Sequence, residues 1–166
     1  MKVKVKKYPH IPLRETLQNA MFECATTCQT FWQDNLLSGM GADGDRPPWK
    51  DTGEAVNDVT ISPQTPTSLE YEVGGDVIQL AIAEFGREAG SLPPREPIAE
   101  WVYRKGIKPH NEDDTMDDVI EAIRWGIYNH GIRGFAPGRL ASLQTENIVV
   151  ETFRKHLEAL EKKVEG

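Results

Sequence analysis

The residues best suited to chemistry are three glutamates around a proline-rich corner. Glu84, Glu88 and Glu96 lie in AEFGREAGSLPPREPIAEW, residues 83–101. Paired carboxylates can act as general acid and general base. An acidic chain offers many such pairs, however, and Ser91 lies in GSLPP rather than in a G-x-S-x-G elbow, with no histidine near it in sequence. The sequence therefore predicts a protein that is not an enzyme, and a small acidic hydrolase or nuclease is the alternative from a different class.

A metal centre has little support. Cys24 and Cys28 are one helical turn apart, but a zinc site needs three or four ligands. The histidines are scattered, with no paired spacing: His10, His110, His130 and His156. Two reduced thiols that face the core are the better interpretation, because free cysteine is readily buried. We expect no metal and no cofactor.

Two further patterns have structural explanations. GMGADG, residues 39–44, matches G-x-G-x-x-G, but a dinucleotide site needs a strand before it, and here a predicted helix precedes it. The acidic run NEDDTMDD, residues 111–118, lacks the central glycine and terminal glutamate of a calcium loop. We predict an exposed loop for the first, and favourable charges at a helix start for the second.

Composition limits the partners. The chain has 166 residues, 39% of them hydrophobic, which suffices for one ordinary domain, and its formal net charge is −7. This charge disfavours a general nucleic-acid binder, since such binding depends on lysine and arginine releasing counterions from phosphates. No apolar run approaches the roughly 18 to 20 residues of a membrane span, and MKVKVKKYPH has no apolar core after its lysines. We expect a protein that is neither secreted nor membrane-spanning.

A long amphipathic helix is predicted over residues 12–38. Its buried stripe recurs at spacings of four, three, four and three: Leu17, Met21, Cys24, Cys28 and Phe31. Its polar side carries Arg14, Glu15, Gln18, Gln29, Gln33 and Asp34. Residues 1–11 are expected to form a flexible arm, because chain ends are poorly ordered unless something holds them.

An antiparallel sheet is predicted after this helix. Apolar and polar residues alternate from Ala55 to Val73, and the turn Gly74-Gly75-Asp76 follows, which indicates a hairpin. The nearly continuous apolar run VIQLAIAEF, residues 77–85, is assigned as a third, central strand. Helices are then expected over residues 96–105, 115–129 and 145–164, the last on an apolar stripe of Val149, Phe153, Leu157, Leu160 and Val164.

The expected fold class is therefore α+β, in one domain over residues 12–166. An antiparallel sheet of three or more strands packs against the long N-terminal helix, and further helices follow toward the C-terminus. The tryptophans divide by context: Trp101 and Trp125 lie on predicted helical faces and are expected in the core, whereas Trp49 follows two prolines in a polar loop and is an interface candidate.

AIAEFGREAGSLPPREPIAEWVYRKGI, residues 81–107, resembles a segment of the tail-completion and head-tail joining (neck) proteins of tailed bacteriophages. In that family a strand ends in glutamate, an aromatic residue and glycine, and a polar turn, a Pro-Pro step and a helix with a tryptophan follow. DTGEAVNDVTI resembles the family's entry into its first strand, and IYNHGIRGFAPGRLAS resembles its closing helix and glycine turn. The likeness covers roughly residues 50 to 160.

The resemblance implies a structural virion protein without catalysis or cofactor. Such a subunit forms a homo-oligomeric ring between the head connector and the tail, touches portal or adaptor proteins on one side and tail tube or tail terminator proteins on the other, and surrounds a channel through which DNA passes without specific binding. It is made in the host cytoplasm, and the virion is its destination. A tail-terminator or minor tail protein is the alternative within the same class.

The corner, residues 83–94, is the expected subunit contact, together with Trp49. Gly86 permits a sharp turn, and Pro93 and Pro94 lower the ordering entropy of the loop, so the corner presents a rigid surface. The predicted contact residues are Trp49, Glu84, Phe85, Gly86, Arg87, Pro93 and Pro94. The alternative is that the corner only joins two elements within one subunit.

Overall fold

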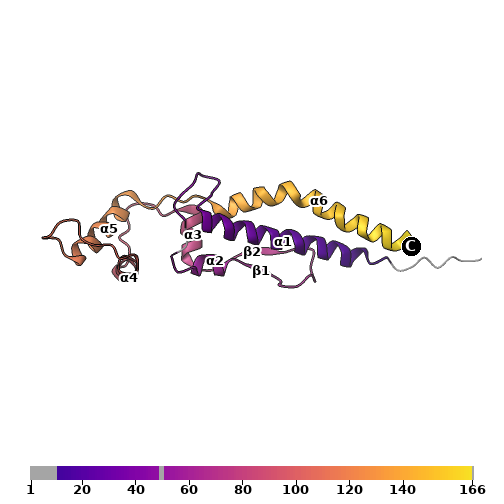
Figure 1. The fold of residues 1–166 in the computed structure, drawn as a ribbon, viewed down its shortest axis with the longest axis horizontal. Helices are drawn as coiled ribbons and strands as arrows, with labels where there is room; N and C mark the ends of the chain where they lie inside the picture. The colour runs from indigo at the N-terminus through magenta and orange to yellow at the C-terminus, as the bar shows by residue number, and fades with distance from the viewer. Residues whose placement is uncertain (1–10, 49–50, 166) are drawn as a thin grey trace, which may run out of the picture.

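The computed structural model describes residues 11–48 and 51–165. These residues form, in order, α1 (Leu13–Ser38), α2 (Glu54–Asp58), β1 (Thr60–Ser62), β2 (Glu72–Gly74), α3 (Ile78–Phe85), α4 (Arg95–Lys105), α5 (Met116–His130) and α6 (Pro137–Glu165). The molecule is elongated, with α1 and α6 side by side along one half and α4 and α5 at the opposite end (Figure 1). We call α4 and α5 the distal lobe, and the other six elements the hairpin body.

Helices α1 and α6 are antiparallel. Near the end of α1, the Asn35 side chain donates to the carbonyl of Pro137, at the start of α6, at 3.0 Å. Nearer the start of α1, Glu23 accepts a hydrogen bond from Lys155 Nζ at 2.9 Å and lies 2.8 Å from His156 Nε2. The helix predicted over residues 12–38 is thus confirmed, and the other elements of the body pack along it.

The short β-hairpin packs on the predicted polar side of α1. Gln18 donates to the Thr67 carbonyl at 2.8 Å, Gln29 donates to the Val59 carbonyl at 2.7 Å, and Gln33 reaches the same Val59 oxygen at 3.3 Å. These carbonyls lie just outside the two strands and need partners. Three glutamines of the predicted polar side thus hold the hairpin through their side-chain amides.

The core of the body lies where α1, α2, α3 and the segment before α6 meet. It is a cluster of buried side chains: Leu36, Ala55, Val59, Leu80, Ala83 and Phe135. Trp32 and Val73 pack against it from α1 and β2. Phe135 is 1% exposed, although the sequence placed it in a loop. The Phe135 ring therefore anchors the segment before α6 to the body.

The distal lobe is a pair of helices with its own small core. Val102 on α4 and Ile120 on α5 are both fully buried. Helix α5 starts with a capping box, in which Thr115 Oγ1 accepts from the Asp118 amide at 3.2 Å and the Asp118 carboxylate accepts from the Thr115 amide at 2.8 Å. The predicted helices over residues 96–105 and 115–129 are confirmed, as is the helix-start role of the acidic run.

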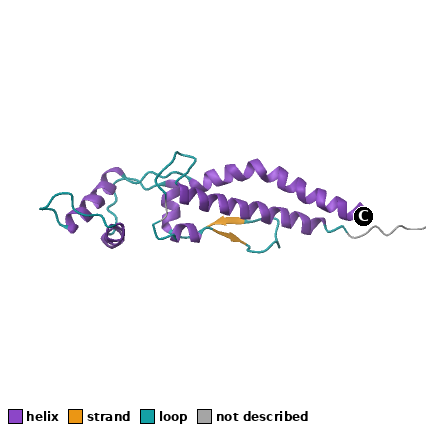
Figure 2. Ribbon diagram, viewed as in Figure 1, coloured by secondary structure: helices purple, strands orange, loops and turns teal. Residues whose placement is uncertain are grey.

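The prediction of an α+β fold with three or more strands is wrong. The described residues are mainly helical, with one two-stranded antiparallel sheet in which Ile61 pairs with Val73 (Figure 2). The run taken as a central strand is helix α3, with Leu80 and Ala83 buried on one side and Ile78 67% exposed on the other. A short apolar run does not distinguish strand from helix, and its glutamine, alanines and leucine favour a helix.

Helix α6 begins eight residues before the predicted start at 145, and its predicted apolar stripe does not face α1 as a unit. Small or polar side chains fill the buried positions instead: Ala141, Thr145 and Thr152, with Leu160. Leu157 and Val164 are 42% and 41% exposed. The stripe predicted the helix but not its packing, because small residues on α6 permit close approach to α1.

Candidate functional site: the corner between α3 and the distal lobe

The corner runs beside the segment that returns from the distal lobe, residues 131–136. Arg87 and Ile132 form an antiparallel pair, with amide-to-carbonyl distances of 2.7 and 2.8 Å. The carbonyl of Ala83 accepts from the amides of Phe135 at 2.8 Å and Ala136 at 3.2 Å. The backbone of the corner is therefore fixed within one chain.

Three glycines make this approach possible. Gly86 has φ 78°, and a Cβ there would lie 2.4 Å from the Ile132 carbonyl oxygen. A Cβ on Gly131 would lie 2.3 Å from the Arg87 oxygen, and one on Gly134 would lie 2.6 Å from the Gly86 nitrogen. Real Cβ atoms do not approach backbone this closely, so each position requires glycine. The sharp turn predicted at Gly86 is present, and it serves a contact between two passages of the same chain.

Glu84 caps the N-terminus of α6. Its carboxylate accepts from the amides of Gly138 at 2.8 Å and Arg139 at 2.9 Å. The first amides of a helix lack partners within the helix, and a carboxylate there also interacts favourably with the helix dipole. Glu84 is thus occupied in joining α3 to α6.

Arg87, Pro93 and Pro94 shape the far side of the corner. The Arg87 guanidinium donates to the Ser91 carbonyl at 3.0 Å and so closes the turn. Pro93 is buried, and its carbonyl accepts from Arg124 Nε of α5 at 2.9 Å. Pro94 is exposed and directly precedes α4. These residues carry the chain from the body into the distal lobe along a defined path.

Phe85, the aromatic residue among the described members of the predicted contact set, points outward. It is 85% exposed at the last position of α3, and Ile78, seven residues earlier, is 67% exposed. Residues seven apart lie on the same helical face. Ala81 between them is also exposed, so α3 presents an apolar strip to the surroundings. Sequence reasoning missed Ile78, although helical spacing across VIQLAIAEF would have paired it with Phe85.

The tryptophans differ from expectation. Trp49 lies outside the described residues. Trp125, predicted to be in the core, is 50% exposed, and its ring packs edge to face against Tyr128 with centroids 5.2 Å apart. Trp101 is half-buried. Trp125 is exposed because the lobe is small, and two helices cannot enclose every large side chain.

The groups considered for chemistry are dispersed or already engaged. No three His, Cys, Asp or Glu side chains gather into a metal-binding group anywhere in residues 11–48 and 51–165. Both cysteines are free; Cys24 is buried, which raises the pKa of its thiol, and Cys28 is half-buried. Glu88 and Glu96 are exposed, whereas Glu84 binds backbone amides. The corner therefore offers a rigid surface with one projecting aromatic ring.

Comparison with known proteins gave no relatives: no family model fits the chain, and neither a curated protein nor a solved structure matches it. In the part of the chain that the structure describes, no helix is long and apolar enough to cross a membrane.

Proposed function

We propose that this protein is a structural subunit of a tailed-phage virion, a neck or tail-completion protein that forms a ring between the head connector and the tail. The support from the sequence is the likeness of residues 81–107 to that family, together with the flanking motifs. The alternative within the class is a tail-terminator or minor tail protein, which would use the same kind of contact with a different neighbour.

The exposure of Phe85 is the observation that carries this proposal. Large aromatic side chains are common interface anchors, and an 85% exposed phenylalanine gains by burial against a neighbour. Its backbone is held by the bonds at Ala83 and Arg87, so little ordering entropy is lost when it binds. We propose that Phe85 and Ile78 insert into the adjacent subunit of the ring, while the corner behind them keeps α3 in place.

The negative charge suits a ring through which DNA moves. At −7, the chain has no excess of cations with which to hold phosphates, and an acidic wall lets a duplex slide where a basic wall would retain it. The portal or adaptor on one side and the tail proteins on the other complete the proposed neighbours.

The test is reconstitution of virus particles that lack this subunit. Wild-type protein is expected to restore tailed particles and to appear as a ring at the head-tail joint in negative stain. Phe85→Ala is expected to fail in reconstitution while its thermal unfolding matches wild type, because the side chain makes few contacts within the chain. Tyr103→Ala, which removes an aromatic ring that is 60% exposed on α4, is the matched control and should reconstitute.

Two outcomes would contradict the proposal. One is normal reconstitution by Phe85→Ala and by Phe85→Glu, since a charge at a buried ring contact could not be tolerated. The other is metal-dependent hydrolysis by the purified protein that is lost on substitution of Glu88 or Glu96, which would assign the chain to the hydrolase or nuclease class.

A further inference from the structure

Helix α6 carries an exposed stripe on the side turned away from α1. The stripe consists of seven residues at spacings of four, three, four, four, three and four: Arg139, Leu143, Glu146, Val150, Arg154, Leu157 and Glu161. Such spacings keep side chains on one face of a helix. Three of the seven are aliphatic and substantially exposed: Leu143 at 48%, Val150 at 67% and Leu157 at 42%. Within the described part of the chain, the contact of this face with another element is the ion pair of Arg139 with Asp43, and its three aliphatic residues stay uncovered.

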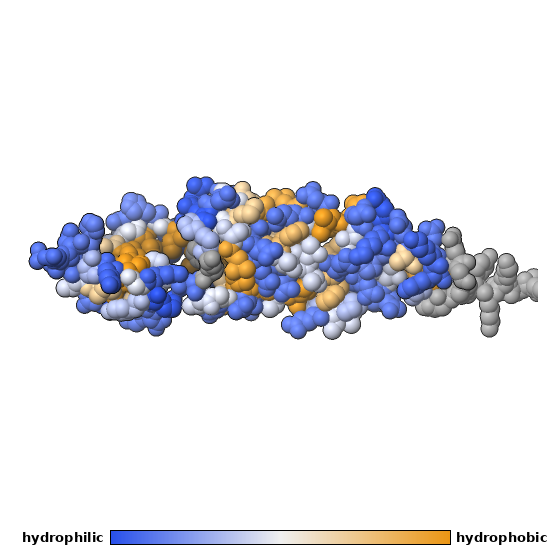
Figure 3. Space-filling model, in the orientation of Figure 1, coloured by the Kyte–Doolittle hydropathy of each residue, from blue (hydrophilic) through white to orange (hydrophobic). Residues whose placement is uncertain are grey.

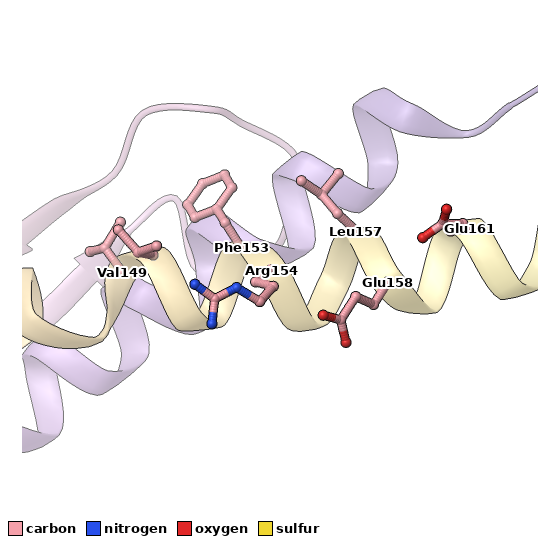
Figure 4. A pocket seen from close by; sticks show the side chains of 7 residues that line it. Val149, Phe153, Arg154, Leu157, Glu158 and Glu161 are labelled. Atoms are coloured by element: carbon pink, nitrogen blue, oxygen red, sulfur yellow. The ribbon is translucent and has the colours of Figure 1, made fainter.

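The surface here is apolar and slightly hollow. A shallow, open depression of about 640 Å³ lies over the C-terminal half of the stripe, with Val150, Phe153 and Leu157 in its lining. Figure 4 shows Phe153 and Leu157 on the same side of α6, with Arg154 and Glu158 beside them. In the space-filling view, hydrophobic surface appears along the edge that α6 forms (Figure 3). A ridge of aliphatic side chains from another helix would fit such a surface.

The order of charges along the stripe indicates which helix could pack on it. Counted from Val150, the stripe has Glu146 and Arg154 four residues to either side. Leu143 and Leu157 lie seven residues to either side. Arg139 and Glu161 lie eleven residues to either side. Each apolar position is thus matched by an apolar one, and each charge by the opposite charge, on reversal about Val150.

We propose that α6 pairs with α6 of a second copy of this chain, antiparallel and centred on Val150. In that arrangement Val150 meets its own copy, Leu143 meets Leu157, and four ion pairs form, two between Glu146 and Arg154 and two between Arg139 and Glu161. A parallel pair in register would place every charge against its own copy. A parallel pair staggered by seven residues would match only two ion pairs.

The charged residues are available for this contact. Glu146 and Glu161 have no cationic partner among residues 11–48 and 51–165. Arg154 pairs with Glu151, three residues earlier, at 2.6 Å, and Arg139 pairs with Asp43. Both arginine side chains remain more than half exposed, and exposed pairs of this kind contribute little stability. Each arginine can therefore meet a partner glutamate at small cost.

The proposed pair is separate from the ring. A two-fold contact closes after two copies, so it cannot generate a ring, which needs two different surfaces on each subunit. It uses α6, whereas the ring proposal uses Phe85 on α3. Failure of one proposal therefore leaves the other standing.

The test is charge reversal in the full chain, with association measured by sedimentation equilibrium. Glu146→Arg and Arg154→Glu, each alone, are expected to weaken pairing about tenfold or more, because each converts two attractive contacts into repulsive ones. The double variant Glu146→Arg/Arg154→Glu should restore wild-type association, and a mixture of the two single variants should form mixed pairs. Lys162→Glu, on another face of α6, is the matched control and should associate like wild type.

Three results would overturn the inference. The first is a wild-type protein that stays monomeric up to about 1 mM, where even contacts worth only about 4 kcal/mol would be populated. The second is a double variant that pairs no better than the single ones, which excludes the antiparallel register. The third is an equal loss in Lys162→Glu. Circular dichroism at low concentration checks that every variant is folded.

Discussion

The hairpin body and the distal lobe are held together by different means. In the body, α1 runs the whole length and contacts the other elements. It binds the hairpin through glutamine amides and α6 through Asn35 and Glu23, and it shares a core with α3. In the lobe, two helices pack mainly on each other around Val102 and Ile120. Stability of a region rises with its buried apolar contacts and falls with its exposure. We therefore expect the lobe to open at a lower free energy than the body.

Among the described residues, two contacts hold the lobe to the body, besides the hydrogen bond from Arg124 of α5 to the Pro93 carbonyl in the corner. One is the backbone pairing of Arg87 with Ile132. The other is ionic: Asp51 accepts from Arg104 Nε at 3.1 Å and lies 2.9 Å from Lys105 Nζ, both at the end of α4. These side chains are partly exposed, so salt screens them. Backbone pairing therefore fixes the position of the lobe, whereas the exposed ion pairs only support it.

The largest loss of stability is expected from Gly86→Val, because this substitution disrupts the junction between the body and the lobe. A β-branched residue at φ 78°, with its Cβ 2.4 Å from the Ile132 oxygen, must displace the return segment. We expect a loss of about 3 kcal/mol or more in the free energy of unfolding, measured by urea denaturation. Gly90→Ala is the control, since Gly90 also has positive φ but open space around it. Unchanged stability with lost particle assembly would mean that the corner acts between subunits alone.

Two single substitutions, one in each core, test whether the body and the lobe unfold independently. Leu36→Ala in the body and Ile120→Ala in the lobe each remove a fully buried side chain, and each should cost about 2 to 5 kcal/mol where it acts. Amide hydrogen exchange should show faster exchange throughout the body for the first, and only in α4 and α5 for the second. Equal acceleration of α1 by Ile120→Ala would show that lobe and body unfold as one unit.

A smaller effect is expected from Thr115→Ala at the capping box of α5. Loss of the hydroxyl leaves the Asp118 amide without its partner and should destabilise the lobe by about 1 kcal/mol. Exchange of the first amides of α5 measures this directly. Thr115→Ser keeps the acceptor and should behave like wild type; if it does not, the methyl group rather than the cap is responsible.

The smallest effect concerns pH. Hydrogen bonds from Lys155 and His156 lower the pKa of Glu23 below its ordinary value near 4.5, and a hydrogen bond from Arg104, with one from Lys105, lowers that of Asp51 below 3.8. A carboxylate with a lowered folded pKa stabilises the protein fully above its unfolded pKa and loses this contribution as pH falls through the folded value. As pH falls below about 4.5, the thermal stability of Glu23→Gln should therefore decrease less steeply than that of wild type, as measured by thermal unfolding. Identical slopes would show that the Glu23 contacts add nothing.

The sequence predicted the helices whose signals are local. Spacing indicated α1, and Thr115 with Asp118 marked the start of α5. It failed where the deciding partner is distant. The cap of α6 is Glu84, 54 positions before Gly138, so the local sequence does not show it; Pro137 at the first helical position was the local signal that the prediction overlooked. Helix α3 was assigned as a strand because a nine-residue apolar run suits either structure.

The candidate site was predicted in part. The sequence identified the sharp turn at Gly86 and the rigid prolines, but not the segment that the turn contacts, because the pairing of Arg87 with Ile132 joins positions far apart in the chain. It named Phe85 but missed Ile78, since a strand assignment separates the two onto opposite faces. The apolar stripe predicted for the last helix shares only Leu157 with the exposed stripe of α6, because the sequence does not show which face of that helix α1 covers.

The pairing of Arg87 with Ile132 also gives the molecule a modular plan. The chain leaves the body and comes back at one spot, so everything between these residues is an inserted unit whose two ends are neighbours. Insertions with adjacent ends are readily tolerated, because they leave the host fold continuous. The far end of this protein can thus lengthen, shrink or be exchanged without disturbing the part that carries it.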